Sequence, residues 1–142
     1  AQIIYYSASG RSAQEGYEQV DLDTVLAKSD IISIHAPLNE HTEGLMDKAA
    51  FAKMKKNCIF LNLGRGPIVV EQDLYEALEN DEIAAAGLDV LCQEPMSETN
   101  PLRKIKDSKK LLITPHVAWA SVEARTKLMG IILGQIKEYF QI

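Results

Sequence analysis

Short apolar runs rich in β-branched residues alternate along the chain with segments whose apolar residues recur every three to four positions. This alternation is typical of a parallel sheet covered by helices, so the predicted fold class is α/β. The strands are predicted at residues 2–7, 30–37, 57–63, 83–91 and 110–114. The helices are predicted at residues 21–28, 47–55, 71–81 and 121–140.

Local signals support the helix assignments. Asp21 and Asp47 stand where an N-cap is expected, and acidic residues begin the helix over 71–81, where the helix dipole favours them. The last helix has one apolar face with three- and four-residue spacing. That face consists of Leu128, Met129, Ile132, Ile136 and Phe140. With no linker or low-complexity tract in the sequence, we expect the chain to be compact to both ends.

Composition narrows the classes of function. The 142 residues suffice for one domain with a core, and 46% apolar with 25% charged residues is ordinary for a soluble globular protein. A net charge of −5 and a pI near 5.2 offer no basic field, so no nucleic-acid partner is expected. No apolar run approaches the roughly 20 residues that span a bilayer, so no membrane association is expected.

The cysteines and histidines indicate a reducing compartment and no metal site. Cys58 and Cys92 lie far apart without CxxC spacing, which favours free thiols over a disulfide. Neither they nor the three histidines have the spacing of metal ligands. The N-terminus lacks the features of a secretory signal. We therefore predict a cytoplasmic protein without a bound metal.

The stretch NLGRGPIVVE, residues 62–71, places an arginine between two glycines directly after an apolar strand. Gly64 and Gly66 would leave both flanks of Arg65 bare, so that a ligand could approach the backbone there. The carboxyl end of a strand is where open α/β sheets place ligand contacts. The alternative is an ordinary surface arginine in a tight turn.

Four ionisable residues follow successive predicted strands: Arg65, Asp89, Glu94 and His116. The carboxyl ends of parallel strands converge on one edge of the sheet, so these residues are expected to meet there. Taken singly, Asp89 and Glu94 would be read as loop carboxylates and His116 as a structural histidine. Together they supply an anion clamp, an acid–base group and a carboxylate partner, the groups needed for chemistry on a small oxyacid.

The segments HAPLNEHTEGLMD, FLNLGRGPIVVEQDLYEAL, AGLDVLCQEP and LLITPHVAWAS carry a family resemblance. In this order and spacing they resemble the nucleotide-binding domain of the D-isomer-specific 2-hydroxyacid dehydrogenases, over essentially all 142 residues. The NPL and TPHVAWAS motifs look most like glycerate dehydrogenases (hydroxypyruvate reductases). The resemblance implies a cytoplasmic, homodimeric oxidoreductase that transfers a hydride between NAD and a small D-2-hydroxy acid or its 2-oxo form.

The resemblance also implies roles for individual residues. Arg65 would hold the substrate carboxylate, His116 would be the general acid–base, and Glu94 would orient its ring and favour the imidazolium form. Asp89 would hold the nicotinamide carboxamide, and Trp119 would lie by the substrate or, alternatively, in an interface or core. Further cofactor contacts are implied for Ser7, His35, Ala36, Pro37, Leu63 and Gly64.

The sequence departs from the family pattern in two ways. Ser7 stands where NAD-preferring relatives usually have an acid, and with Arg11 nearby NADP becomes the alternative to the favoured NAD. The chain also contains no GxGxxG, the glycine cradle for a pyrophosphate. We therefore expect a partial Rossmann-like, doubly wound parallel sheet that lacks its first βα unit.

In that interpretation residues 1–142 are the C-terminal portion of a dinucleotide-binding domain, with the terminal helix at about 121–140. The substrate domain would be absent, and the chain alone would be inactive. A nucleotide-sensing, corepressor-like binding protein on the same fold is the main alternative function. Formate dehydrogenases, which are related enzymes, usually pair the histidine with glutamine, so Glu94 argues against formate dehydrogenase activity.

Overall fold

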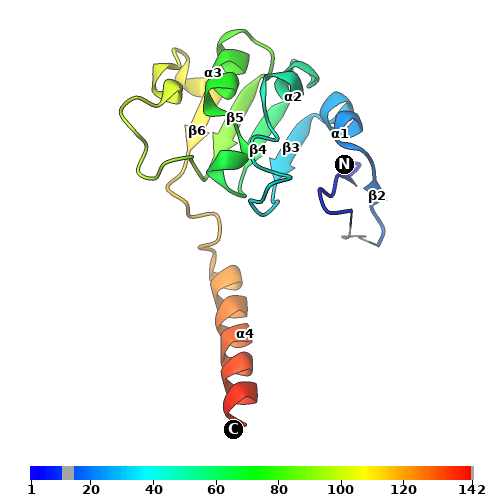
Figure 1. Cartoon of the computed structure of the whole chain (residues 1–142), viewed down its shortest axis with the longest axis vertical. Helices are drawn as coiled ribbons and strands as arrows, with labels where there is room; N and C mark the ends of the chain where they lie inside the picture. Colours follow the sequence, from blue (N-terminus) through cyan, green and yellow to red (C-terminus); the bar gives the residue numbers. More distant parts are fainter. Residues whose placement is uncertain (11–14, 142) are drawn as a thin grey trace.

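The computed structural model describes residues 1–10 and 15–141 of the chain. Figure 1 shows an α/β body from which one long helix projects. Arg11, which bears on the choice between NAD and NADP, lies outside the described residues.

The body is built on a parallel sheet of four strands in the order β3-β4-β5-β6. Helix α2 (Lys48–Ala52) connects β3 to β4, and helix α3 (Glu71–Glu79) connects β4 to β5. Two 3₁₀ turns, Pro101–Lys104 and Ser108–Lys110, lie between β5 and β6. The strands are β3 (Ile31–Ile34), β4 (Ile59–Asn62), β5 (Ala85–Leu88) and β6 (Leu111–Ile113). Because all four are parallel, their carboxyl ends lie along one edge of the sheet, called the C-terminal edge below.

The N-terminal segment forms a second, two-stranded parallel sheet. β1 (Ile4–Tyr5) pairs with β2 (Glu18–Gln19), and helix α1 (Leu22–Lys28) then leads to β3. The sequence predicts β1 but misses β2, and it does not predict a separation into two sheets. A cavity of about 420 Å³ lies between β1 and β3 and is lined by residues of both. The parallel α/β, Rossmann-like fold class is confirmed.

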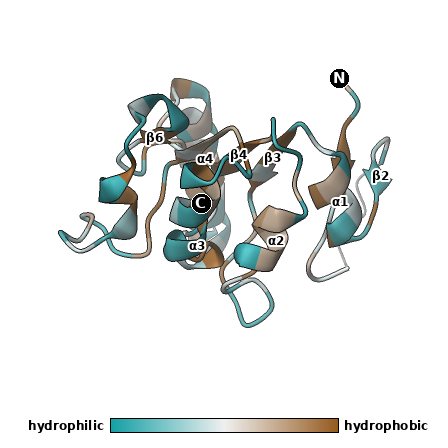
Figure 2. Ribbon diagram, turned by 90° about the horizontal axis from the view of Figure 1, so that it is seen from above, coloured by the Kyte–Doolittle hydropathy of each residue, from teal (hydrophilic) through white to brown (hydrophobic). Residues whose placement is uncertain are grey.

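The core lies between the four-stranded sheet and the helices that cover it. Phe51 of α2 meets Phe60 of β4 edge to face, with ring centroids 5.5 Å apart. Leu74 and Leu78 of α3 lie four positions apart, on one helix face, and are fully buried. The ribbons of α2 and α3 carry both hydrophobic and hydrophilic positions (Figure 2), and the buried residues are Ala50 and Phe51 in α2 and Leu74, Ala77 and Leu78 in α3. Burying this many aliphatic and aromatic side chains fixes the sheet, and with it the loops at the C-terminal edge.

Among the described residues, side-chain caps begin three of the four α-helices, and two of these caps, Asp21 and Asp47, are predicted from the sequence. Asp21 accepts a hydrogen bond from the Thr24 amide at 2.6 Å, and Asp47 accepts one from the Ala50 amide at 2.9 Å. Ser121 caps the last helix, α4 (Val122–Phe140). Each cap satisfies an amide that has no partner within the helix.

Helix α4 has the predicted bounds but not the predicted packing. It carries no buried residue, and all five residues of its apolar face are exposed. In Figure 1 the helix extends away from the sheet, so the expectation of a chain compact to its C-terminus is wrong. The amphipathic pattern predicts an apolar face, but no described part of the chain covers it. Among the described residues, no helix is long and apolar enough to cross a membrane.

Candidate active site

The structure places the predicted ionisable residues along the C-terminal edge. Arg65 follows β4, Asp89 is the first residue after β5, and His116 lies three residues after β6. Glu94 lies in the loop that leaves β5. The parallel order of these strands therefore brings together residues that are up to 51 positions apart in sequence.

Glu94 and His116 form a direct pair. His116 Nδ1 lies 2.9 Å from Glu94 Oε2, and both side chains are part-exposed, at 41% and 39%. The other carboxylate oxygen, Oε1, accepts a hydrogen bond from the Leu91 amide at 2.9 Å. The Leu91 amide and then His116 hold the pKa of Glu94 below its ordinary value. Glu94 is therefore an anion at neutral pH, fixed by one backbone contact and aimed at the histidine ring.

His116 sits in an unusual turn. Its φ is +55°, in the left-handed region that a non-glycine residue rarely adopts. Its amide donates to the Thr114 carbonyl at 3.0 Å, and the indole Nε1 of Trp119 donates to the His116 carbonyl at 2.9 Å. The buried carboxylate of Asp89 binds the same turn from the sheet side. The ring of His116 is thus presented from a tightly specified loop.

Trp119 is 57% exposed, so the core role that the sequence left open is wrong for this residue. Its hydrogen bond to the His116 carbonyl ties the indole to the backbone of the turn that carries the histidine. The structure leaves its two other predicted roles, substrate contact and interface contact, as predictions.

The turn that carries Arg65 is held by a side chain that the sequence interpretation missed. Asn62, 1% exposed, donates through Nδ2 to the Arg65 carbonyl at 3.0 Å and accepts from the Gly64 amide at 3.1 Å. Arg65 itself is exposed, and its Nη1 donates to the Gly64 carbonyl at 2.7 Å. An asparagine at the end of an apolar strand favours a turn in which its side chain bonds the backbone, and this signal could have predicted the role of Asn62.

The flanks of Arg65 are not open to a ligand as the sequence suggested. A Cβ at Gly64 would lie 2.9 Å from the Ala36 carbonyl oxygen, and one at Gly66 would lie 2.0 Å from the Leu91 carbonyl. The two glycines therefore serve close packing of the protein's own backbone. Gly66 brings the Arg65 turn directly against the loop that carries Glu94.

A second missed group fixes the loop after β5. Glu71, the first residue of α3, accepts from the Cys92 amide at 2.9 Å and from the Asn100 side chain at 2.8 Å. Asn100 is buried and also accepts from the Leu102 amide. The loop of Glu94 is therefore tied to α3 at two points, which sequence reasoning could not see because 21 and 29 residues separate the partners.

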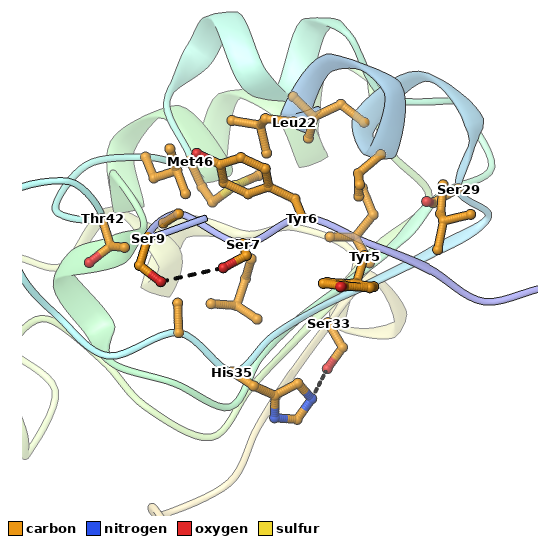
Figure 3. A pocket seen from close by; sticks show the side chains of 18 of the residues that line it. Tyr5, Tyr6, Ser7, Ser9, Leu22, Ser29, Ser33, His35, Thr42 and Met46 are labelled. Atoms are coloured by element: carbon orange, nitrogen blue, oxygen red, sulfur yellow. Dashed lines mark hydrogen bonds between the residues drawn. The ribbon is translucent and has the colours of Figure 1, made fainter. Parts of the chain in front are cut away.

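The residues predicted to contact a cofactor line two neighbouring cavities. Ser7, His35, Ala36 and Pro37 border the 420 Å³ cavity between β1 and β3. Figure 3 shows Ser7 bonded to Ser9 after β1, and His35 bonded to Ser33 at the end of β3. A second cavity of about 480 Å³ shares His35 to Pro37 and adds Leu63, Gly64 and Arg65. The turn after β3 borders both cavities and therefore connects the cavity near Ser7 with the cavity near Arg65.

A third cavity of about 680 Å³ adjoins the acid–base pair. Asp89, Glu94 and His116 line it together with Met96 and other apolar residues. Among the described residues, no group of three or more His, Cys, Asp or Glu side chains could hold a metal ion. Cys58 and Cys92 are free thiols, as predicted.

A family model for the NAD-binding domain of the D-isomer specific 2-hydroxyacid dehydrogenases matches residues 1–118. A hydroxypyruvate reductase of Blautia hydrogenotrophica is 43% identical over 141 residues, which are 98% of this chain and 43% of that protein.

Solved structures agree with this match. An acyclic imino acid reductase in complex with NADPH and D-Arg superposes with a TM-score of 0.85 at 34% identity, over 99% of this chain and 43% of that one. A D-lactate dehydrogenase with NAD⁺ from Lactobacillus jensenii gives 0.80 at 33%, over 94% and 43%. The chain thus spans about 43% of the length of these proteins.

Proposed function

This chain belongs to the D-isomer specific 2-hydroxyacid dehydrogenase family, and we propose that it acts in an oxidoreductase that transfers a hydride between NAD and a small D-2-hydroxy acid. Glycerate and hydroxypyruvate are the favoured substrate pair, a choice supported by the relative named hydroxypyruvate reductase. In this proposal residues 1–142 contribute the nucleotide-binding portion, and a separate substrate domain completes the enzyme. The 142-residue chain by itself is then expected to show no turnover.

The observation that carries the proposal is the Glu94–His116 pair at the sheet edge that also carries Arg65. Because Nδ1 of His116 is engaged by Glu94, Nε2 is the ring nitrogen assigned to proton transfer. In reduction, the imidazolium donates its proton to the C2 oxygen of the oxo acid; in oxidation, the neutral ring takes it back. The contact between the Glu94 carboxylate and Nδ1 holds the ring in one orientation.

Arg65 is proposed to bind the substrate carboxylate and polarise its C2 carbonyl. A guanidinium matches a carboxylate with two parallel hydrogen bonds, which fixes the orientation of the substrate. The side chain is exposed and its anchor, the Gly64 carbonyl, lies in its own turn, so it can exchange this contact for an incoming anion. Trp119 is proposed to lie beside the substrate.

The residues present fit a dinucleotide. Two linked cavities run from Ser7 across His35, Ala36 and Pro37 to Leu63 and Gly64, in the direction of Arg65. Ser7 is proposed at the adenosine ribose, the turn after β3 along the middle, and Leu63 with Gly64 at the nicotinamide ribose. When bound, NAD⁺ would accept the hydride from C2 of the hydroxy acid, and NADH would supply it to C2 of the oxo acid. A role for Asp89 at the nicotinamide carboxamide is part of the same proposal, and NADP is the alternative cofactor because Ser7 is not acidic.

The protein is proposed to be a cytoplasmic homodimer that has no nucleic-acid partner. The exposed apolar face of α4 supports association with further protein, and the net charge of −5 disfavours nucleic acid. Two free cysteines support a reducing compartment. Sedimentation of the protein that carries this sequence measures the assembly directly.

The test is oxidation of NADH or NADPH by that protein in the presence of hydroxypyruvate, glyoxylate or pyruvate. We expect turnover with NADH and the highest kcat/KM for hydroxypyruvate. Tight NADH binding without turnover on any oxo acid would instead favour the nucleotide-sensing alternative.

A further inference from the structure

The buried carboxylate of Asp89 accepts three hydrogen bonds at the C-terminal edge. The residue is 4% exposed, and its Oδ1 accepts from the Thr114 hydroxyl at 2.6 Å and from the Val117 amide at 2.9 Å. Its Oδ2 accepts from the Ala118 amide at 2.8 Å. All three donors belong to the loop after β6. One side chain directly after β5 therefore holds both sides of the turn that contains His116.

The backbone of Asp89 is itself fixed to the sheet. Its amide donates to the Asn62 carbonyl at the end of β4, at 3.0 Å. The Thr114 amide in turn donates to the Leu88 carbonyl at 2.9 Å, which places the start of the turn against β5. Asp89 thus connects the ends of strands β4 and β5 to the loop that contains His116.

The turn needs such a support because His116 is held at a φ of +55°. A left-handed conformation costs a non-glycine residue roughly 1–2 kcal/mol and persists only where the surroundings enforce it. The bonds of Asp89 flank that residue: Thr114 precedes it by two positions, and Val117 with Ala118 follow it directly. Without them the turn is free to relax, and the ring moves away from Glu94.

The charge of Asp89 is maintained despite its burial. Burial acts to raise the pKa of this carboxyl, but the Thr114 hydroxyl and the two amides outweigh burial, and the pKa lies below its ordinary value. An anion in this position accepts three hydrogen bonds at once, which a neutral amide side chain cannot do.

We propose that Asp89 is a positioning residue, which enforces the strained turn of His116 and so keeps Nδ1 in contact with Glu94. This inference rests on the proposed function, in which that pair moves the proton. It is a second role beside the proposed contact with the nicotinamide carboxamide, because here the carboxylate acts on the catalytic loop of its own chain.

Asp89→Asn tests the proposal because it keeps the size and removes one acceptor. If the amide oxygen stays on Thr114 and Val117, the new NH₂ group meets the Ala118 amide, and two donors face each other. The matched control is Asp107→Asn. Asp107 also accepts from a backbone amide, that of Lys109 at 3.0 Å, but it precedes β6 at the opposite edge of the sheet.

The first measurement is steady-state reduction of hydroxypyruvate together with the Kd for NADH. A displacement of about 1 Å at a reacting group can cost roughly 100-fold in rate, so we expect Asp89→Asn to lower kcat about 10- to 100-fold. Loss of the proposed carboxamide contact alone would raise the Kd for NADH, so the positioning role predicts that the fall in kcat exceeds the rise in Kd. A large rise in Kd with kcat retained would overturn the proposal in favour of cofactor binding.

The second measurement separates positioning from general destabilisation. The Glu94→Gln change should shift the pH profile of kcat/KM in the wild-type background but not in Asp89→Asn, because the pair is already broken there. An unchanged Glu94→Gln shift in both backgrounds would contradict the inference.

Nitrogen NMR of the His116 ring gives a readout that requires no turnover. We expect the Nδ1 signal to lose its hydrogen-bonded position in Asp89→Asn and to keep it in Asp107→Asn. If the wild type has no activity, the proposed function fails, yet this spectrum still decides whether Asp89 holds the pair. Should Asp89→Asn fail to fold, Thr114→Val removes only one of the three bonds, and a partial shift of the same signal is expected; an unmoved signal would refute the role.

Discussion

Replacing Gly66 with alanine adds one methyl group where two loops meet. The new Cβ would lie 2.0 Å from both the carbonyl carbon and oxygen of Leu91, and 2.4 Å from the Cys92 amide nitrogen. Ordinary contact begins at 3.4 Å, so the two backbone segments have to separate by about 1.4 Å. No flexible side chain is available to absorb this movement, because all three atoms are backbone.

The cost follows from what holds the second segment in place. The Leu91 amide is bonded to Glu94 and the Cys92 amide to Glu71, so moving the peptide strains both contacts. Overpacking typically costs about 1–3 kcal/mol, and we expect Gly66→Ala to reach about 3 kcal/mol. Because Glu94 moves with its loop, kcat/KM should also fall about 100-fold.

Urea unfolding followed by circular dichroism measures the stability part. The matched control is Gly130→Ala in α4, where an added Cβ meets nothing within 4 Å. That change should leave the unfolding midpoint of the body unchanged and raise the helicity slightly, since alanine is favoured over glycine in a helix by about 1 kcal/mol. A Gly66→Ala midpoint equal to that of Gly130→Ala would refute the close approach on which the reasoning depends.

Three further predictions follow from the same geometry. Arg65→Ala should raise the barrier for oxo-acid reduction by on the order of 2–4 kcal/mol while the Kd for NADH stays near wild type; a kcat/KM within a few-fold of wild type would be inconsistent with a carboxylate contact. Because the Leu91 amide and His116 keep the pKa of Glu94 low, Glu94 is charged at neutral pH. Glu94→Gln should therefore shift the alkaline limb of the reduction profile to lower pH and extend oxidation in the same direction, whereas superimposable profiles would show no coupling. Cys92 is an exposed residue, but partial burial of its thiol and the nearby Glu71 raise the pKa of that thiol to about 11. The thiol should therefore react slowly with iodoacetamide at pH 8. Labelling as fast as that of a free cysteine would contradict this.

Sequence patterns predict the helix starts and the buried strands, because these depend on residues close together in the chain. Asp21, Asp47 and Ser121 begin helices because a short polar side chain reaches an amide three positions ahead, and the two predicted caps, Asp21 and Asp47, are confirmed. The four strands of the main sheet are predicted because buried parallel strands are continuous apolar runs. β2 is missed because its two residues, Glu18 and Gln19, are exposed and carry no such pattern.

The supports of the site depend on contacts between distant residues, which no pattern encodes. Glu71 looks ordinary in the sequence, and Gly66 was interpreted there as access for a ligand; only the fold brings these residues against the loop that carries Glu94. Likewise, the apolar period of α4 predicts a face to be covered, but it cannot specify what covers it. The pairing of Glu94 with His116 was predicted from the family resemblance and is present at 2.9 Å.

The central claim is that His116 transfers the proton that accompanies hydride transfer to a 2-oxo acid. The most direct measurement is the formation of D-glycerate from hydroxypyruvate and NADH, quantified by chiral chromatography, for wild type, His116→Ala and the control His41→Ala. The side chain of His41 is 69% exposed, and its Nε2 lies 3.6 Å from Glu40 Oε1. We predict D-glycerate from wild type and His41→Ala, and a rate about 100- to 10,000-fold lower for His116→Ala, the usual range for loss of a general acid. Wild-type rates in His116→Ala, or L-glycerate as the product, would contradict the account.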